Sequence, residues 1–115
     1  METRQIIEEI VPKVLAENKD LIEKINATYM FKIEGASNWF LDLTKPDQPI
    51  EEVVKEAQCD VDTDSASFVE MAMGNLNTQM AFLAGKFRTN EPQLAVRLNA
   101  LIEGIVEHIA KNNLA

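Results

Sequence analysis

The sequence holds a single cysteine, Cys59, and a single histidine, His108, among its 115 residues. One cysteine cannot form a disulfide within the chain, so the hydrophobic core must hold the fold together. One histidine excludes a metal site built from several histidines of one chain. We therefore expect neither a metal nor a cofactor.

Long hydrophobic runs are also missing. No stretch approaches the roughly 18 apolar residues that a membrane-spanning helix needs. The first residues, METRQIIEEIVPK, lack the apolar core of a signal peptide, and the last, KNNLA, match no peroxisomal or retention signal. These features lead us to expect a cytoplasmic protein.

Basic residues are few relative to acidic ones, since 11 lysines and arginines stand against 19 aspartates and glutamates. The resulting net charge of −8 repels phosphate groups, which argues against nucleic acid as a partner and against electrostatic docking on anionic membranes. Hydrophobic residues make up 46% of the chain, enough for one core. The length fits one domain, which we place at residues 1–115.

The first half changes from a helical to an alternating pattern. Ile6, Ile10 and Val14 share one helical face, in which Pro12 should introduce a kink or begin a second segment. Apolar residues then alternate with polar ones in TYMFKIE and NWFLDLT, which a short Gly-Ala-Ser turn separates. This pattern predicts an antiparallel hairpin with one buried face.

The second half is mostly helical in pattern. A loop is expected at 45–49, but residues 50–57 remain ambiguous, because Val53 and Val54 favour a strand whereas the glutamates and lysine favour a helix. Glycines after two helical segments are typical of left-handed helix ends. The expected elements are a strand at 59–63, a helix ending at Met73 before Gly74, a helix at 77–84 before Gly85, an edge strand at 86–89 and a long helix capped by Asn90.

One segment matches the opening of an EF-hand calcium loop. Asp60, Asp62 and Asp64 have the spacing of its first three ligands. The match then fails, because Ser65 stands where glycine should make the turn and Met71 stands where a bidentate glutamate is needed. The alternative is the solvent face of a strand that leads into a helix cap, which we favour.

Signals for catalysis are weak. Cys59 and His108 could form a nucleophile and base, but Cys59 lies on the apolar phase of its strand, where a buried, inert thiol is the usual outcome. Carboxylate pairs such as Glu8–Glu9 resemble a solvated helix face, and no pair stands out as an acid and a base in different environments. We therefore expect no enzyme activity.

Flexible apolar side chains gather between residues 68 and 83, where three of the five methionines lie. Methionine suits surfaces that must fit variable apolar partners. Ordinary core packing gives the same pattern and, from the pattern alone, is the simpler interpretation.

Several motifs of the second half occur together. They are Gly74, Leu76, Asn77 and Gln79 in a G-x-L-N-x-Q turn, then Ala81, Phe82, Gly85 and Lys86, and then an A-x-x-L helix. With the upstream FKIEG and NWFLDL segments, they resemble the sterol carrier protein domain family, in particular a free-standing microbial member. The resemblance covers about residues 5 to 110.

The resemblance implies an α+β fold with a five-stranded, mostly antiparallel sheet and about five helices that cover one face and enclose a hydrophobic tunnel. It favours a third strand for residues 50–57. It also implies that Gln79 meets the polar part of a lipid and that the last helix closes the tunnel. The residues expected to bind lipid are Phe31, Trp39, Phe68, Met71, Leu76, Gln79, Met80, Leu83, Leu98, Leu101 and Ile105.

A family member of this kind would bind and carry an apolar lipid, such as a fatty acid, an acyl thioester, a sterol-like molecule or a phospholipid, without chemistry. Its partners would be that lipid and, transiently, a membrane or a lipid enzyme, with no nucleic acid. Two alternatives stay open. One is an accessory protein that presents an isoprenoid quinone precursor or an acyl thioester to biosynthetic enzymes, and the other is an interaction module with a filled core.

Overall fold

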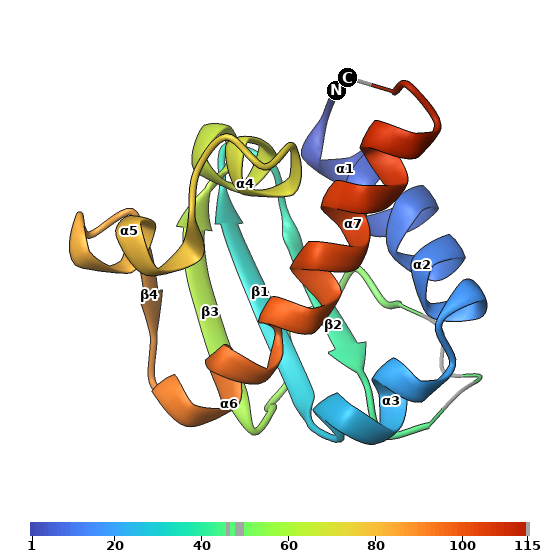
Figure 1. The fold of residues 1–115 in the computed structure, drawn as a ribbon. Helices are drawn as coiled ribbons and strands as arrows, with labels where there is room; N and C mark the ends of the chain where they lie inside the picture. The colour runs from blue at the N-terminus through green and yellow to red at the C-terminus, as the bar shows by residue number, and fades with distance from the viewer. Residues whose placement is uncertain (46, 48–49, 115) are drawn as a thin grey trace.

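Helices cover one face of a four-stranded sheet in a computed structural model that describes residues 1–45, 47 and 50–114 (Figure 1). The strand order is β2-β1-β3-β4, in which β1 pairs antiparallel with β2 and parallel with β3, and β3 pairs antiparallel with β4. The strands are β1 (Thr28–Glu34), β2 (Asn38–Asp42), β3 (Cys59–Asp64) and β4 (Phe87–Thr89).

The helices of the described residues form five units. The first runs through α1 (Thr3–Gln5), η1 (Ile6–Ile10) and α2 (Val11–Glu17), with the wider turns of a π-helix in η1 and Pro12 at the start of α2. The backbone stays helical from η1 into α2, so Pro12, which has no N–H to donate, lies within one continuous helical unit beside the wider turns of η1. The others are α3 (Asp20–Ile25), α4 (Ser65–Ala72), α5 (Thr78–Leu83), and α6 (Pro92–Arg97) followed by α7 (Asn99–Lys111).

The predicted hairpin of β1 and β2 is confirmed. Tyr29 lies opposite Leu41 and Phe31 opposite Trp39, and all four side chains are buried under the helices. The expectation of a single buried face was wrong, because alternate residues of the other face, such as Met30, are buried as well. Something must therefore cover the second face.

The segment 50–58 supplies that cover. The Lys55 backbone amide donates to the Met30 sulfur at 3.4 Å, and the Lys55 ammonium lies 4.6 Å from the centre of the Phe40 ring. Glu51 forms the segment's one bridge, with Phe40. The described sheet thus has four strands. The prediction of a third strand at residues 50–57, within a five-stranded sheet, was wrong. After Glu51 the chain leaves the edge of β2 and crosses beneath the hairpin. The predicted loop at 45–49 falls mostly on residues 46, 48 and 49, outside the described residues.

The second half follows its turn signals closely. Asp64 caps α4 by accepting a hydrogen bond from the Ser67 amide at 2.7 Å, and Gly74 and Gly85 have φ angles of +81° and +75°, as predicted. The predicted cap at Asn90 was wrong, because its side-chain oxygen accepts a hydrogen bond from the Asp60 amide at 2.8 Å. The helix begins at Pro92 and breaks at Leu98, so the predicted long helix is the pair α6 and α7.

Helix α7 crosses the sheet and packs against α2 and α4 (Figure 1). Gly104 allows the close approach to α2, because a Cβ atom there would lie 2.7 Å from Cγ1 of Val14. The apolar stripe of α7 points into the core, where Leu101, Ile105 and Ile109 are buried. These contacts hold the helical layer over β1 and β3.

Candidate functional site

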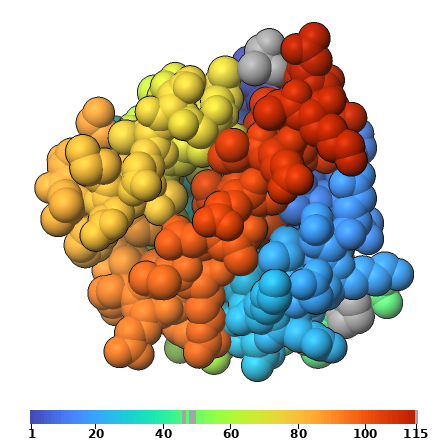
Figure 2. Space-filling model, in the orientation of Figure 1, coloured from blue at the N-terminus to red at the C-terminus, as the bar shows by residue number. Residues whose placement is uncertain are grey.

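A cavity of about 390 Å³ lies between the sheet and the helices α4 to α7. Figure 2 shows it as a hollow between the α4–α5 region, in yellow to orange, and the α6–α7 region, in orange to red. The buried part of its lining is mostly apolar and consists of Phe31, Val61, Thr63, Phe68, Met71, Ala95 and Leu98.

Strand alternation positions the floor of the cavity. Phe31 of β1 lies beside Val61 of β3 in the parallel register, so both side chains face the helices. Phe68 of α4 packs against Phe31 with 6.4 Å between the ring centres. The floor therefore joins the first half of the chain to the second.

Helix α5 and the short strand β4 form one side of the cavity. Asn77 caps α5 by accepting hydrogen bonds from the amides of Gln79 and Met80. The Phe82 ring lies 6.4 Å from that of Phe87 on β4, and both side chains line the cavity. This aromatic pair fixes α5 beside the sheet edge.

Polar but uncharged side chains lie near the opening. The Thr78 hydroxyl is 2.9 Å from Oδ1 of Asn99, which links α5 to the start of α7 across the cavity. Gln79 lines the same part of the cavity and is exposed to solvent. The site thus combines a buried apolar floor with amide and hydroxyl groups at its mouth.

The structure brings only part of the expected lipid-binding set into this cavity. Phe31, Phe68, Met71, Gln79 and Leu98 all line it. They come from β1, α4, α5 and the break between α6 and α7. Segments far apart in the sequence therefore meet around one cavity.

The remaining expected residues lie elsewhere. Met80 and Leu83 face solvent with 62% and 74% of their surface exposed, because Gln79 and Phe82 occupy the inner face of α5. Leu101 and Ile105 are buried in the core, since Asn99 and Ile102 take the cavity side of α7. Outside the lining as well are Leu76, which is half-buried, and Trp39, which is buried beneath α1 and η1.

Several lining residues were not anticipated from the sequence. The alternation of β3 and β4 carried the signal for Val61, Thr63, Phe87 and Thr89, because each lies in phase with an inward apolar residue. No sequence pattern indicated the α6 residues, since their exposure to the cavity depends on where the helix lies against the sheet. The unanticipated lining residues are Val61, Thr63, Thr78, Phe82, Phe87, Thr89, Pro92, Ala95, Val96, Asn99 and Ile102.

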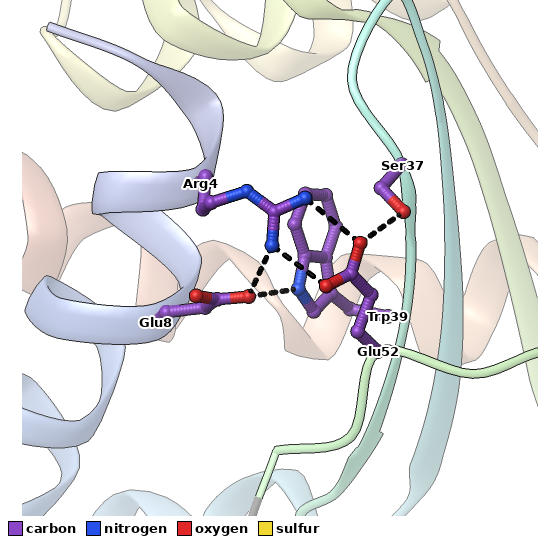
Figure 3. Close-up of polar contacts among 5 residues, drawn as sticks. All are labelled: Arg4, Glu8, Ser37, Trp39 and Glu52. Atoms are coloured by element: carbon purple, nitrogen blue, oxygen red, sulfur yellow. Dashed lines mark hydrogen bonds and ion pairs between the residues drawn. The ribbon is translucent and has the colours of Figure 1, made fainter.

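Trp39 belongs to a separate polar cluster (Figure 3). The Arg4 guanidinium lies 5.3 Å from the Trp39 ring centre and pairs with Glu52 at 2.6 Å and Glu8 at 2.8 Å. The indole N–H donates to Glu8 at 2.9 Å and the Ser37 hydroxyl to Glu52 at 2.7 Å. Hydrogen bonds from Arg4 and Ser37 lower the pKa of Glu52 to about 2. The cluster ties the first helix to β2 and to segment 50–58, which is a structural role.

The two candidates for a catalytic dyad are engaged with other groups. The Cys59 sulfur lies 3.2 Å from the Thr89 hydroxyl, and burial raises the pKa of this thiol. The His108 ring nitrogen Nδ1 lies 3.9 Å from a Glu17 carboxylate oxygen. A raised thiol pKa reduces the thiolate available for nucleophilic attack.

The acidic motif after Cys59 serves the fold. Asp64 caps α4, and Asp60 lies 3.6 Å from the Lys32 ammonium. Within residues 1–45, 47 and 50–114, no cluster of three or more His, Cys, Asp or Glu side chains is arranged to hold a metal ion. Over the same residues, no helix is both long and apolar enough to cross a bilayer.

The fold and the cavity define an α+β domain in which helices enclose an apolar site against one face of a sheet. A model of the SCP-2 sterol transfer family matches residues 7–103. The chain belongs to this family.

Relatives and solved structures agree with this assignment. Hydroxysteroid dehydrogenase-like protein 2 of Xenopus laevis is 28% identical over 90 residues, which cover 74% of this chain and 22% of that protein. The matched segments amount to 22% to 24% of the curated relatives. Each relative is thus a much longer protein than the matched domain.

Two solved structures have the same fold at 20% identity. Sterol carrier protein domain 2 of Helicoverpa armigera superposes with a TM-score of 0.73, covering 88% of this chain and 86% of that one. Sterol carrier protein 2 of Aedes aegypti, in complex with palmitate, gives a TM-score of 0.59 and covers 82% of this chain and 94% of that one.

Proposed function

We propose that this chain binds an apolar lipid in the cavity between the sheet and α4 to α7, and carries it without changing it chemically. The cavity, with its buried apolar floor, is the observation that supports this function most directly. Its volume falls within the range of about 300–1,000 Å³ typical of small-molecule sites. Membership of a sterol transfer family and the palmitate bound by the Aedes aegypti protein support a ligand with a long apolar chain or ring system.

Apolar transfer supplies the affinity in this proposal. Each methylene moved from water to an apolar site contributes about 0.8 kcal/mol. The floor residues Phe31, Phe68, Met71 and Leu98 would contact the chain or ring system of the lipid, while Gln79 would meet its polar end. Because apolar contacts discriminate weakly, we expect the site to accept a range of chain lengths.

The cavity also bears on the alternatives. An interaction module with a filled core would leave no such space, so the structure favours the lipid-binding interpretation over it. An accessory protein for a lipid enzyme would use the same cavity and differ only in its partner. The separate engagement of Cys59 and His108 supports binding without catalysis. A single buried thiol suits the reducing cytoplasm, where we place this function.

Lipid exchange requires contact with a membrane, and α5 is the element suited to it. Met80 and Leu83 project into solvent beside Phe82, which belongs both to the exposed surface and to the cavity lining. Residues 71–90 contain no acidic residue and include Lys86 and Arg88, in a chain whose net charge is −8. We propose that this edge of the molecule contacts the bilayer surface transiently.

Filling the cavity tests the proposed function. Ala95 is buried and lines the cavity, so Ala95→Phe should place a ring in the empty space and keep the fold. If the ring displaces two methylenes, affinity for a fluorescent long-chain lipid should fall by about tenfold. Val54→Phe, at an exposed site on segment 50–58, is the matched control. Equal affinity in both variants, with native circular dichroism spectra, would rule out this cavity as the lipid site.

A further inference from the structure

The cavity is uncharged throughout the lining that the structure describes. Its polar members are three threonines, one glutamine and one asparagine, and its other members are apolar. A lipid held here would therefore meet hydrogen-bonding groups but no charged side chain of the lining.

Lys86, just before β4, and Arg88 within it lie away from the cavity. Phe87 and Thr89 line the cavity, whereas Lys86 and Arg88, which alternate with them, line a polar groove on the opposite face of the sheet. Successive side chains of a strand face opposite sides, so the position of Arg88 between Phe87 and Thr89 follows from the backbone. Lys32 and Asp62 belong to the same groove, which places these charges beyond the sheet.

The charges of the helices around the cavity are directed elsewhere as well. Arg97 of α6 donates to the Ile25 carbonyl at 3.1 Å, which turns its guanidinium toward α3. Glu70, Glu91 and Glu103 are exposed, and none belongs to the lining. The helices thus contribute neither a cation nor a carboxylate to the cavity lining.

Neutral donors and acceptors converge at the mouth instead. Oδ1 of Asn99 can only accept a hydrogen bond, so the Thr78 hydroxyl donates to it, and Nδ2 of Asn99 remains as a donor. The exposed Gln79 amide adds one acceptor and a second donor group. A hydroxyl, ester, amide or ketone can pair with these groups without bringing a charge.

We propose that the cavity selects lipids with an uncharged, hydrogen-bonding head, such as a long-chain alcohol, amide, ester or ketone, over ionised fatty acids. This proposal rests on the proposed function and specifies its ligand class. An ionised carboxylate entering the mouth loses part of its hydration and gains no counter-ion, whereas a neutral head exchanges water for amide and hydroxyl partners. The apolar chain contributes equally in both cases, so the head decides the preference.

Three ligands of equal chain length separate the head from the chain. Palmitate, palmitamide and cetyl alcohol are titrated at pH 7.5 as competitors of a fluorescent neutral lipid, each below the concentration at which it self-associates. We expect the amide and the alcohol to bind at least about tenfold tighter than palmitate.

Adding a cation at the mouth should reduce this preference. Val96 lines the cavity and is 63% exposed, so a lysine fits there without disturbing the core. Val96→Lys should tighten palmitate binding severalfold relative to palmitamide. Val96→Gln removes the same valine without adding charge and should not change that ratio.

The outcomes separate the two proposals. If palmitate binds the unaltered protein as tightly as palmitamide, or if Val96→Lys leaves their ratio unchanged, the preference for uncharged heads is wrong and lipid binding stands. If neither the fluorescent lipid nor any of the three ligands binds, the proposed function itself is wrong, and the preference falls with it.

Discussion

Tyr29 shows how one side chain connects the sheet to the helices over the cavity. It is the only tyrosine of the chain, its side chain is buried, and its hydroxyl donates to the Leu94 carbonyl at 2.6 Å. This bond joins β1 to α6, the helix that supplies Ala95 and Val96 to the lining. Burial, with a smaller contribution from the nearby Cys59, raises the pKa of Tyr29 to about 12.

We expect the Tyr29 phenol to resist alkaline titration in the folded protein. Its ordinary pKa of 10.0 applies to the unfolded chain, so its contribution to stability is present below pH 10 and is lost as the pH rises toward 12. Because the chain has one tyrosine, phenolate absorbance follows this group alone. The absorbance should rise only well above pH 10, or together with unfolding.

Tyr29→Phe is the matched variant, because it lacks only the hydroxyl. Its unfolding free energy at pH 7 should be lower by about 1 kcal/mol, since one buried hydrogen bond is lost. Its stability should then vary less than that of the unaltered protein between pH 10 and 12. A phenol that ionises near pH 10 while the far-UV and near-UV circular dichroism stay native would contradict the buried hydrogen bond.

Strand residues of the site could be predicted from the sequence, and helix residues less well. Alternation in β1 placed Phe31 on the buried face, and the structure puts it in the cavity lining. On α5, Met80 and Leu83 are as apolar as Phe82, and the sequence gives no reason why only Phe82 turns inward. The rotation of a six-residue helix is fixed by its packing partner, here Phe87, which no local pattern reveals.

At the scale of elements, α5 is notable for the apolar surface that it leaves in water. Full burial of a Leu or Met side chain contributes about 1.5–3 kcal/mol, so even partial insertion of Met80 and Leu83 into a bilayer gives measurable binding. Basic residues near the helix would favour anionic lipids locally, although the chain as a whole is acidic.

We predict that the double variant Met80→Gln/Leu83→Gln loses about tenfold or more in vesicle affinity, because both side chains lose their apolar transfer energy. The measurement is flotation with vesicles of phosphatidylcholine and phosphatidylglycerol. Val54→Gln, which removes an equally exposed apolar residue on segment 50–58, should float like the unaltered protein. Equal flotation of all three proteins would show that α5 is not the membrane contact.

Two elements departed from expectation for long-range reasons. Segment 50–58 carried strand and helix signals together, and its course is set by the need to cover Met30 and Phe40 on the second face of the hairpin. Asparagine is a common helix cap, but the side-chain oxygen of Asn90 accepts a hydrogen bond from the Asp60 amide instead. In both cases a partner distant in sequence decided the outcome.

For the whole molecule, the distribution of charge matters more than its sum. Residues 71–102 contain one acidic residue, Glu91, and three basic ones, while the rest of the chain holds the other 18 acids. Helix α5 and most of the residues that line the cavity lie within this less acidic part. The prediction against electrostatic docking on anionic membranes used only the net charge of −8 and left out this local difference, which is visible in the sequence.

The α+β fold class was implied by the family resemblance, whereas the hairpin and the edge strand could be predicted from the sequence pattern, because each depends on local periodicity and turn residues. The cavity could not, because its volume depends on how closely α4, α5 and α6 approach the sheet. The resemblance to sterol carrier protein domains supplied that expectation, and five of its eleven proposed residues, Phe31, Phe68, Met71, Gln79 and Leu98, do line the space.

Native mass spectrometry of the purified protein, followed by solvent extraction, tests directly whether the cavity holds a lipid. We predict discrete added masses that extract as lipids, or that form on incubation with a panel of acyl and isoprenoid lipids, and that are lost in Ala95→Phe. A bare protein mass that stays unchanged after the same incubation would contradict it, and would mean that the helices close over the cavity in solution.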